Sequence, residues 1–244
     1  MGRFQKAIPI ILTLTLGACT FHHPSAPISL KGELPDMPPP FTAWRSLPAP
    51  QLVWNGAVQA KFQFYLRENK RELEASLERL AEYLPGLLPI FERYALPPEL
   101  LYLGVVESAF RPEVKSRAGA TGIWQLMKPI AAEYGLKVGL FVDERKDPLK
   151  STEAVAQILL DLYREFDDWY LALAAYNAGK FRIARVIRET GAKDFWSLCE
   201  TGRLRAETEQ FVPKFIAVAL ILEEGERYGL RDLLDERIAN RTGN

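Results

Sequence analysis

Residues 98–110, with the sequence PELLYLGVVESAF, are the stretch that decides the fold. Pro98 suits the first turn of a helix, where a missing N–H leaves no intrahelical bond unmade. The residues that follow are almost all apolar up to about Phe110, which predicts a helix in the core of the protein. Glu107 stands near the end of this helix, among apolar neighbours.

This position makes Glu107 a candidate acid catalyst. Burial among Leu103, Val106 and Phe110 would disfavour the charged carboxylate and raise its pKa. A carboxylic acid that stays protonated near neutral pH can donate a proton to the oxygen of a glycosidic bond. An acidic residue after an apolar run is, however, more often a surface residue at a helix end, so the local sequence leaves both interpretations open.

A long amphipathic helix is predicted upstream, over residues 56–84. Its apolar residues recur three or four positions apart. They are Val58, Phe62, Tyr65, Leu66, Leu73, Leu77, Leu80 and Leu84. The charged residues of the opposite face are expected to be solvated. Pro85 and Gly86 are expected to end this helix, and a shorter helix over residues 87–94 is expected to follow.

The chain downstream of residue 110 is also predicted to be helical. Helices are expected near residues 124–134, 151–166, 170–178, 181–190 and 207–228. Thr152 and Glu153 suit the first turn of the second of these. Few segments alternate between apolar and polar residues with the period of two that is typical of β-strands, and no internal repeat is visible. The fold class is therefore predicted to be mainly α.

Composition excludes several classes of function. Lys and Arg together number 31, as do Asp and Glu, so the net charge is zero and no basic excess points to nucleic acid. Histidine occurs only at positions 22 and 23, and cysteine only at 19 and 199. A Ser-His-Asp triad, a Cys-His dyad and a Cys/His metal site are therefore excluded from the body of the chain. Any catalysis must use carboxylates, hydroxyls, amides or lysines.

The N-terminal segment is typical of a bacterial secretory signal. Arg3 and Lys6 precede the apolar residues 7–16, a run too short to span a bilayer. Residues 16–19, LGAC, resemble a lipobox, which implies cleavage after residue 18 and a lipid on Cys19. An uncleaved anchor and a plain signal peptide are the alternatives. Thr20 follows the cysteine and is not Asp, which favours the outer membrane by analogy with the sorting rule.

Residues 19–52 are expected to form a tether, because frequent prolines there prevent regular helix. Cys199 would then be the only free thiol, and it is expected to be a small buried apolar residue near Phe195 and Trp196.

Four groups of residues further along resemble the motifs of one enzyme family. They are residues 107–110 (ESAF) with Ser116 and 119–127 (GATGIWQLM); 143–148 (DERKDP) with 151–152; 174–179 (AAYNAG); and 207–208 (ET) with 211–214 (FVPK). In order and spacing they resemble lytic transglycosylases with a soluble-lytic-transglycosylase domain, which is goose-lysozyme-like. The resemblance implies a lysozyme-like helical catalytic domain over residues 96–231, an N-terminal helical region over 53–95 and a tail over 232–244.

The resemblance also implies a role for individual residues. It makes Glu107 the single acid/base and Ser116 the hydroxyl that orients it. It implies that the sugar is bound by Gln125, Met127, Tyr176 and Asn177, and that Glu207 is a partner orienting the cleft. Gly119 and Gly122 would let the backbone turn tightly beside the sugar.

Each of these residues also has a structural alternative. Ser116 could cap a turn, Met127 could pack in the core, and Glu207 could only begin a helix. Tyr176 could be a packed aromatic residue with its hydroxyl pointing outward. Trp124 is expected in the core rather than against sugar. The acidic and basic residues of the second motif are expected to form a structural cluster; they are Asp143, Arg145 and Asp147.

Two departures from the family pattern stand out. Relatives often have tyrosine where this chain has Phe211, which leaves the tuning of Glu107 in doubt. No wall-binding repeats are expected after the catalytic helices, so contact with the wall would rest on the catalytic domain and the lipid anchor.

The implied activity is cleavage of the β-1,4 bond between N-acetylmuramic acid and N-acetylglucosamine in peptidoglycan, giving 1,6-anhydro ends without water. No metal or organic cofactor is expected. The substrate is expected to be the glycan strand, the site periplasmic, and the membrane contact a lipid on Cys19. No protein partner is identified. A muramidase that uses water and a non-catalytic wall-binding lipoprotein are the alternatives.

Overall fold

The computed structural model describes residues 47–223. The predicted signal peptide, Cys19, most of the tether and the C-terminal tail lie outside these residues. Within residues 47–223, no helix combines the length and the apolar character that crossing a membrane requires.

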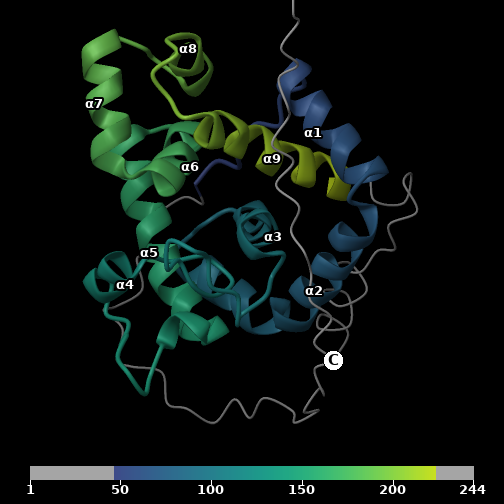
Figure 1. The fold of residues 1–244 in the computed structure, drawn as a ribbon, viewed down its shortest axis with the longest axis vertical. Helices are drawn as coiled ribbons and strands as arrows, with labels where there is room; N and C mark the ends of the chain where they lie inside the picture. The colour runs from purple at the N-terminus through teal and green to yellow at the C-terminus, as the bar shows by residue number, and fades with distance from the viewer. Residues whose placement is uncertain (1–46, 224–244) are drawn as a thin grey trace, which may run out of the picture. The chain divides into compact units, whose positions relative to one another are not determined.

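The described chain is built of helices (Figure 1). They are α1 (Gly56–Arg67), α2 (Lys70–Arg93), α3 (Leu103–Ser108), α4 (Lys128–Glu133), α5 (Pro148–Phe166), α6 (Trp169–Ala178), α7 (Lys180–Thr190), α8 (Phe195–Glu200) and α9 (Ala206–Glu223), with 3₁₀ turns η1 (Pro98–Tyr102) and η2 (Glu144–Lys146). Between residues 47 and 223 the extended backbone amounts to isolated bridges such as Thr121 with Leu126. The prediction of a mainly α fold is confirmed.

The predicted long amphipathic helix is present as two helices, α1 and α2. Asn55 begins α1 by accepting a hydrogen bond of 3.0 Å from the backbone N–H of Val58. The prediction that Pro85 and Gly86 end the helix was wrong, since α2 continues through Pro85 and Pro89. Each proline costs a backbone bond and crowds the preceding turn. The buried apolar stripe continues on both sides of them, and its packing outweighs that cost.

Short α3 lies among the longer helices, and α9 crosses over it between α1 and α6 (Figure 1). Gly104 of α3 lets the chain pack closely, because a Cβ there would lie 2.6 Å from the ring of Phe110. Trp124 is buried against Phe91 and Phe110. Its indole N–H donates a hydrogen bond of 2.8 Å to Thr152. The prediction that Trp124 is a core residue is confirmed.

Several predicted helix ends differ from the structure. The helix expected over 99–110 starts as the 3₁₀ turn η1 and ends at Ala109, which has a left-handed φ of 53°. The helix expected from residue 124 is confined to α4, because residues 121–126 form a backbone-bonded turn. Helix α5 starts at Pro148, not at residue 151, because Asp147 caps it through the N–H groups of residues 149 and 150.

Helix α8 was not predicted. It begins with a capping box in which Asp194 and Ser197 exchange side-chain to backbone hydrogen bonds. Cys199 on this helix is half-buried against the core, less completely than expected, and burial raises its pKa to about 11.

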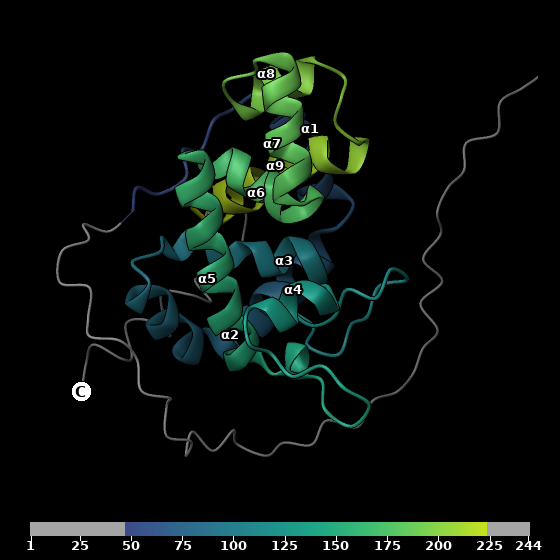
Figure 2. The same cartoon turned by 90° about the vertical axis from the view of Figure 1, so that its left-hand side faces the viewer.

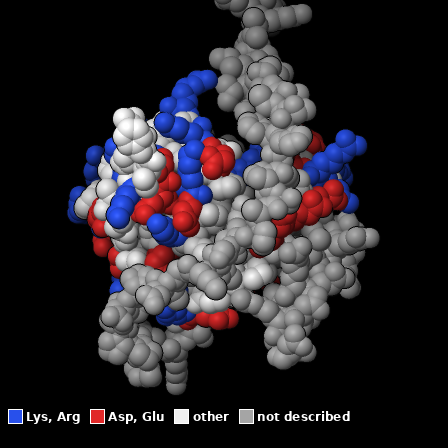
Figure 3. All heavy atoms as spheres, turned by 90° about the horizontal axis from the view of Figure 1, so that it is seen from below, with Lys and Arg blue, Asp and Glu red and all other residues white. Residues whose placement is uncertain are grey.

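The segment between α4 and α5 extends away from the helices (Figure 2). Its tip carries the exposed apolar side chains of Leu140, Phe141 and Val142. On the face viewed in Figure 3, acidic and basic side chains are interspersed, in keeping with the zero net charge.

Candidate active site

Glu107 lies in the last turn of α3, at a rigid end of that helix. The two residues after Ser108, Ala109 and Phe110, have φ angles of 53° and 59°, which non-glycine residues adopt only at a cost. The buried ring of Phe110 and the hydroxyl of Ser108, which donates a 2.7 Å hydrogen bond to the carbonyl of Ile123, hold them there. The backbone around the acid is therefore fixed by packing.

The surroundings of Glu107 keep its carboxyl protonated. The side chain retains partial solvent exposure, but desolvation of the carboxyl is the main cause that raises its pKa to about 8. The negative charge of Glu207 raises the pKa further, and the positive charge of Lys214 opposes it. Near neutral pH this carboxyl can donate a proton, which is the chemistry expected from the sequence.

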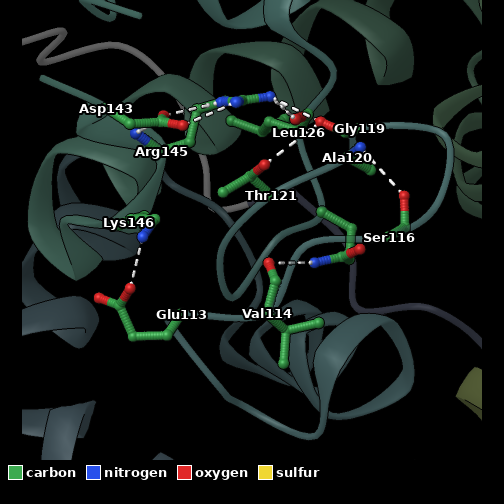
Figure 4. A network of polar contacts seen from close by, with 11 residues as sticks. Glu113, Val114, Ser116, Gly119, Ala120, Thr121, Leu126, Asp143, Arg145 and Lys146 are labelled. Atoms are coloured by element: carbon green, nitrogen blue, oxygen red, sulfur yellow. Dashed lines mark hydrogen bonds and ion pairs between the residues drawn. The ribbon is translucent and has the colours of Figure 1, made fainter. Parts of the chain in front are cut away.

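Residues 111–127, between α3 and α4, form a loop held by backbone hydrogen bonds and by the side-chain contacts drawn in Figure 4. Ser116 closes one turn of this loop, since its hydroxyl oxygen accepts a hydrogen bond of 3.0 Å from the N–H of Ala120. The turn-capping alternative for Ser116 therefore holds. Its hydroxyl proton is still a potential donor, so the role beside Glu107 stays a prediction.

Gln125 is also engaged by the loop. Its backbone has a φ of 48°, and its side-chain amide donates to the carbonyls of Val114 and Gly122, at 3.2 and 2.9 Å. The amide oxygen is the part of this side chain left to accept a bond from a sugar. Met127, two residues later, is 43% exposed at the start of α4, so the core-packing alternative for Met127 is wrong.

Arg145 fixes the far side of the loop. This buried guanidinium binds both carboxylate oxygens of Asp143, at 2.8 and 2.7 Å, and donates to the carbonyls of Gly119 and Leu126, both at 2.9 Å (Figure 4). With Asp147 as the cap of α5, the expectation of a structural cluster here is confirmed.

Tyr176 connects helix α6 to this loop. Its hydroxyl donates a hydrogen bond of 2.7 Å to the backbone carbonyl of Trp124. Burial, and next the charge of Glu107, raise the pKa of Tyr176 well above its usual value, so the phenol lies within electrostatic reach of the acid. The tyrosine therefore stays neutral, and its oxygen can still accept a hydrogen bond.

Asn177 follows on the same helix and faces α9. Its side-chain oxygen accepts a hydrogen bond of 2.9 Å from the hydroxyl of buried Thr208. This bond holds α6 against the start of α9, where Glu207 is exposed. The amide nitrogen of Asn177 is a donor that a carbonyl oxygen of substrate could use.

The structure thus brings Tyr176 and Glu207 each within electrostatic reach of Glu107. Ser116 and Gln125 belong to the loop that Tyr176 contacts through Trp124, and their roles toward substrate stay predictions. Phe211 is buried in α9 and presents no hydroxyl.

No role was predicted from the sequence for Lys214, the last residue of the motif over residues 211–214. The available signal was its spacing of seven residues from Glu207, which places both on one face of a helix. Among residues 47–223 no cluster of three or more His, Cys, Asp or Glu side chains could hold a metal ion.

Residues 91–199 match the family model of the transglycosylase SLT domain. Over 182 residues the chain is 38% identical to membrane-bound lytic murein transglycosylase D of Escherichia coli K12, a match that covers 72% of this chain and 39% of that protein. Over 137 residues it is 33% identical to membrane-bound lytic murein transglycosylase F of Pseudoalteromonas translucida, covering 50% of this chain and 28% of that protein.

The lytic transglycosylase Slt of Pseudomonas aeruginosa, solved as an inactive mutant, aligns over 60% of this chain and 24% of its own, with 25% identity and a TM-score of 0.48. The chain spans about two fifths of the length of the transglycosylase D that it matches. The resemblance carried by the sequence motifs is confirmed by the domain match.

Proposed function

We propose, since the chain carries a transglycosylase SLT domain, that it cleaves the glycan strands of peptidoglycan between N-acetylmuramic acid and N-acetylglucosamine without water. The observation that carries the proposal is the carboxyl of Glu107, whose pKa is raised to about 8 at a fixed helix end. Such a carboxyl supplies the proton that the leaving oxygen requires.

The first step breaks the glycosidic bond. Glu107 transfers its proton to the oxygen that leaves with N-acetylglucosamine, and the bond from that oxygen to C1 of N-acetylmuramic acid breaks. The oxocarbenium-like carbon is stabilised by the N-acetyl group of the same sugar. Neutral Tyr176 beside the carboxyl helps to position that sugar, together with the amide of Asn177.

The second step closes the ring. Glu107, now a carboxylate, removes the proton from the C6 hydroxyl of the same sugar, and O6 forms a bond to C1. The acid is restored and the product ends in 1,6-anhydro-N-acetylmuramic acid. Because the nucleophile is part of the substrate, its effective concentration is high, and one carboxyl performs both proton transfers.

The product masses test this proposal. Protein without the first 18 residues would be incubated with purified peptidoglycan, and the fragments would be analysed by mass spectrometry. Anhydro ends should dominate, each lighter by one water than a reducing end. Reducing ends would instead identify a hydrolytic muramidase, and wall binding without fragments would identify a non-catalytic lipoprotein.

A pair of variants tests the assignment of Glu107. Glu107→Gln keeps the size of the side chain and removes the transferable proton, so cleavage should fall by at least about a thousandfold. Glu189→Gln, which changes an exposed α7 residue ion-paired with Arg185, is the matched control and should keep normal activity. Normal activity in Glu107→Gln would overturn the assignment.

The same proposal includes a periplasmic location and a lipid on Cys19 that anchors the enzyme to the outer membrane. Two relatives bear names that call them membrane-bound. Cells fed a labelled fatty acid should label the full chain, and Cys19→Ser should abolish that label. Fractionation of outer from inner membrane then tests the destination.

A further inference from the structure

Two lysines lie on helices that are far apart in sequence but pack together, α1 and α9, and they are within electrostatic reach of each other. Lys61 of α1 donates a hydrogen bond of 2.9 Å to the side-chain oxygen of Gln210 on α9, where the two helices pack together. Lys214 lies four residues after Gln210, so it shares the same face of α9. Glu207, three residues before Gln210, extends this face toward Glu107.

The two ammonium groups repel each other. Desolvation is the first cause that lowers the pKa of Lys61, and the positive charge of Lys214 is the second. Neither lysine has a carboxylate within 4.0 Å among residues 47–223, although other lysines of this region, such as Lys146 and Lys150, are ion-paired. Both are partly buried. Two partly buried cations within electrostatic reach of each other, neither ion-paired among residues 47–223, produce a local positive potential that attracts an anion.

The position of Lys214 relates this potential to catalysis. Its charge lowers the pKa of Glu107, so an anion held by the lysines would lie within electrostatic reach of the catalytic acid. The peptide stems that branch from N-acetylmuramic acid carry free carboxylates, and they leave the strand next to the bond that would be cut.

We propose that Lys61 and Lys214 form a carboxylate-binding site that holds the acidic peptide stem of the substrate while Glu107 acts on the glycan. The inference rests on the proposed function. It gives helix α1, which lies outside the matched residues 91–199, a part in substrate binding. Lys61 belongs to the charged face that was expected to be solvated, and its hydrogen bond to Gln210 is exposed, in keeping with that expectation.

Lys61 is the residue to change. Glu107 is not among the groups that shift the pKa of Lys61, and Lys61 is not among the groups that shift the pKa of Glu107. Lys61→Met removes the cation and keeps an unbranched side chain. Arg67→Met removes a cation from the last turn of the same helix, where the side chain is exposed, and is the matched control.

Each protein would be assayed on native glycan strands and on strands whose stem carboxylates have been converted to amides beforehand. With wild type and Arg67→Met, amidation should raise KM about tenfold and leave kcat nearly unchanged, as for the loss of one charge-assisted contact. With Lys61→Met, KM should be raised already on native strands, and amidation should change it little. Lys61→Arg should restore the response to amidation.

Binding gives a second measurement that needs no turnover. Glu107→Gln protein should sediment with native peptidoglycan more than with amidated peptidoglycan, and adding Lys61→Met should remove the difference. If Lys61→Met keeps the full response to amidation in either assay, the carboxylate site is overturned. Anhydro products with that result would overturn the site and leave the proposed function intact, whereas reducing ends with a response to amidation that Lys61→Met removes would overturn the proposed function and support the site.

Discussion

The hydroxyl of Tyr176 and the backbone carbonyl of Trp124 are joined by a hydrogen bond of 2.7 Å. Trp124 is anchored in the core through Thr152 of α5, so the bond connects helix α6 to a fixed point of the loop. The same phenol is within electrostatic reach of Glu107. One side chain therefore connects helix α6 to the loop with Gln125 close enough to the acid to respond to its charge.

The variant Tyr176→Phe removes this bond and leaves the carbonyl of Trp124 without its partner. The expected loss of unfolding free energy is about 1–2 kcal/mol, since a buried acceptor loses its donor while the ring still packs. Urea unfolding measures it. The rate of cleavage should also fall, and by more than the smaller fraction of folded protein explains, because the loop near the acid becomes less firmly held. Unchanged stability would show that the bond contributes nothing.

The longer helices could be predicted from sequence because their apolar stripes repeat with helical period over two or more turns. Helices α5, α6 and α7 are where the pattern placed them, within a few residues, and α9 begins one residue before the expected start; its expected end at residue 228 lies outside the described residues. Trp124 in the core and the ionic cluster of Asp143 and Arg145 were likewise predictable, because an indole N–H and opposite charges need nearby partners.

The remainder depended on contacts between distant parts of the chain. Pro85 stays helical only because the buried stripe of α2 packs on both sides of it, which no local preference reveals. The bond between Lys61 and Gln210 joins residues 149 positions apart. The sequence marked Glu107 as a candidate, but its pKa depends on Glu207 and Lys214, which only the folded chain brings near.

The raised pKa of Glu107 predicts how stability depends on pH. The folded state holds this proton up to about pH 8, whereas the unfolded chain releases it near the ordinary value of 4.5. Between these values the folded state binds more protons, so unfolding free energy falls as pH rises through this window. The penalty is complete above pH 8 and absent below about 4.5.

Glu107→Gln has no proton to lose and should not have this penalty. It should be more stable than wild type by about 5 kcal/mol above pH 8, with the gain vanishing toward pH 4.5. Urea unfolding at several pH values measures the difference. A difference that is constant across the window, or that grows toward acid, would contradict the raised pKa.

Glu207 should help to set the pH at which cleavage activity declines on the alkaline side. Cleavage by the free enzyme should decline as pH rises through about 8, because the acid loses its proton. Since the charge of Glu207 raises the pKa of Glu107, Glu207→Gln should move this decline to lower pH. Glu209→Gln, two residues along α9, is the control and should leave the limb in place. Equal shifts in both variants, or none in either, would exclude this role for Glu207.

The two glycines of the loop should respond differently to alanine. Both have positive φ angles, 92° at Gly119 and 85° at Gly122, so each alanine carries backbone strain of about 1–2 kcal/mol. At Gly119 nothing lies within 4 Å of an added Cβ, and strain is the whole cost. At Gly122 the Cβ would lie 1.9 Å from the backbone carbonyl oxygen of Arg145, which cannot move without disturbing its ion pair and hydrogen bonds.

Gly122→Ala should therefore lose at least about 2 kcal/mol more unfolding free energy than Gly119→Ala. Urea unfolding of the two variants measures this, and equal losses would show that the close approach of the two segments is not what requires glycine.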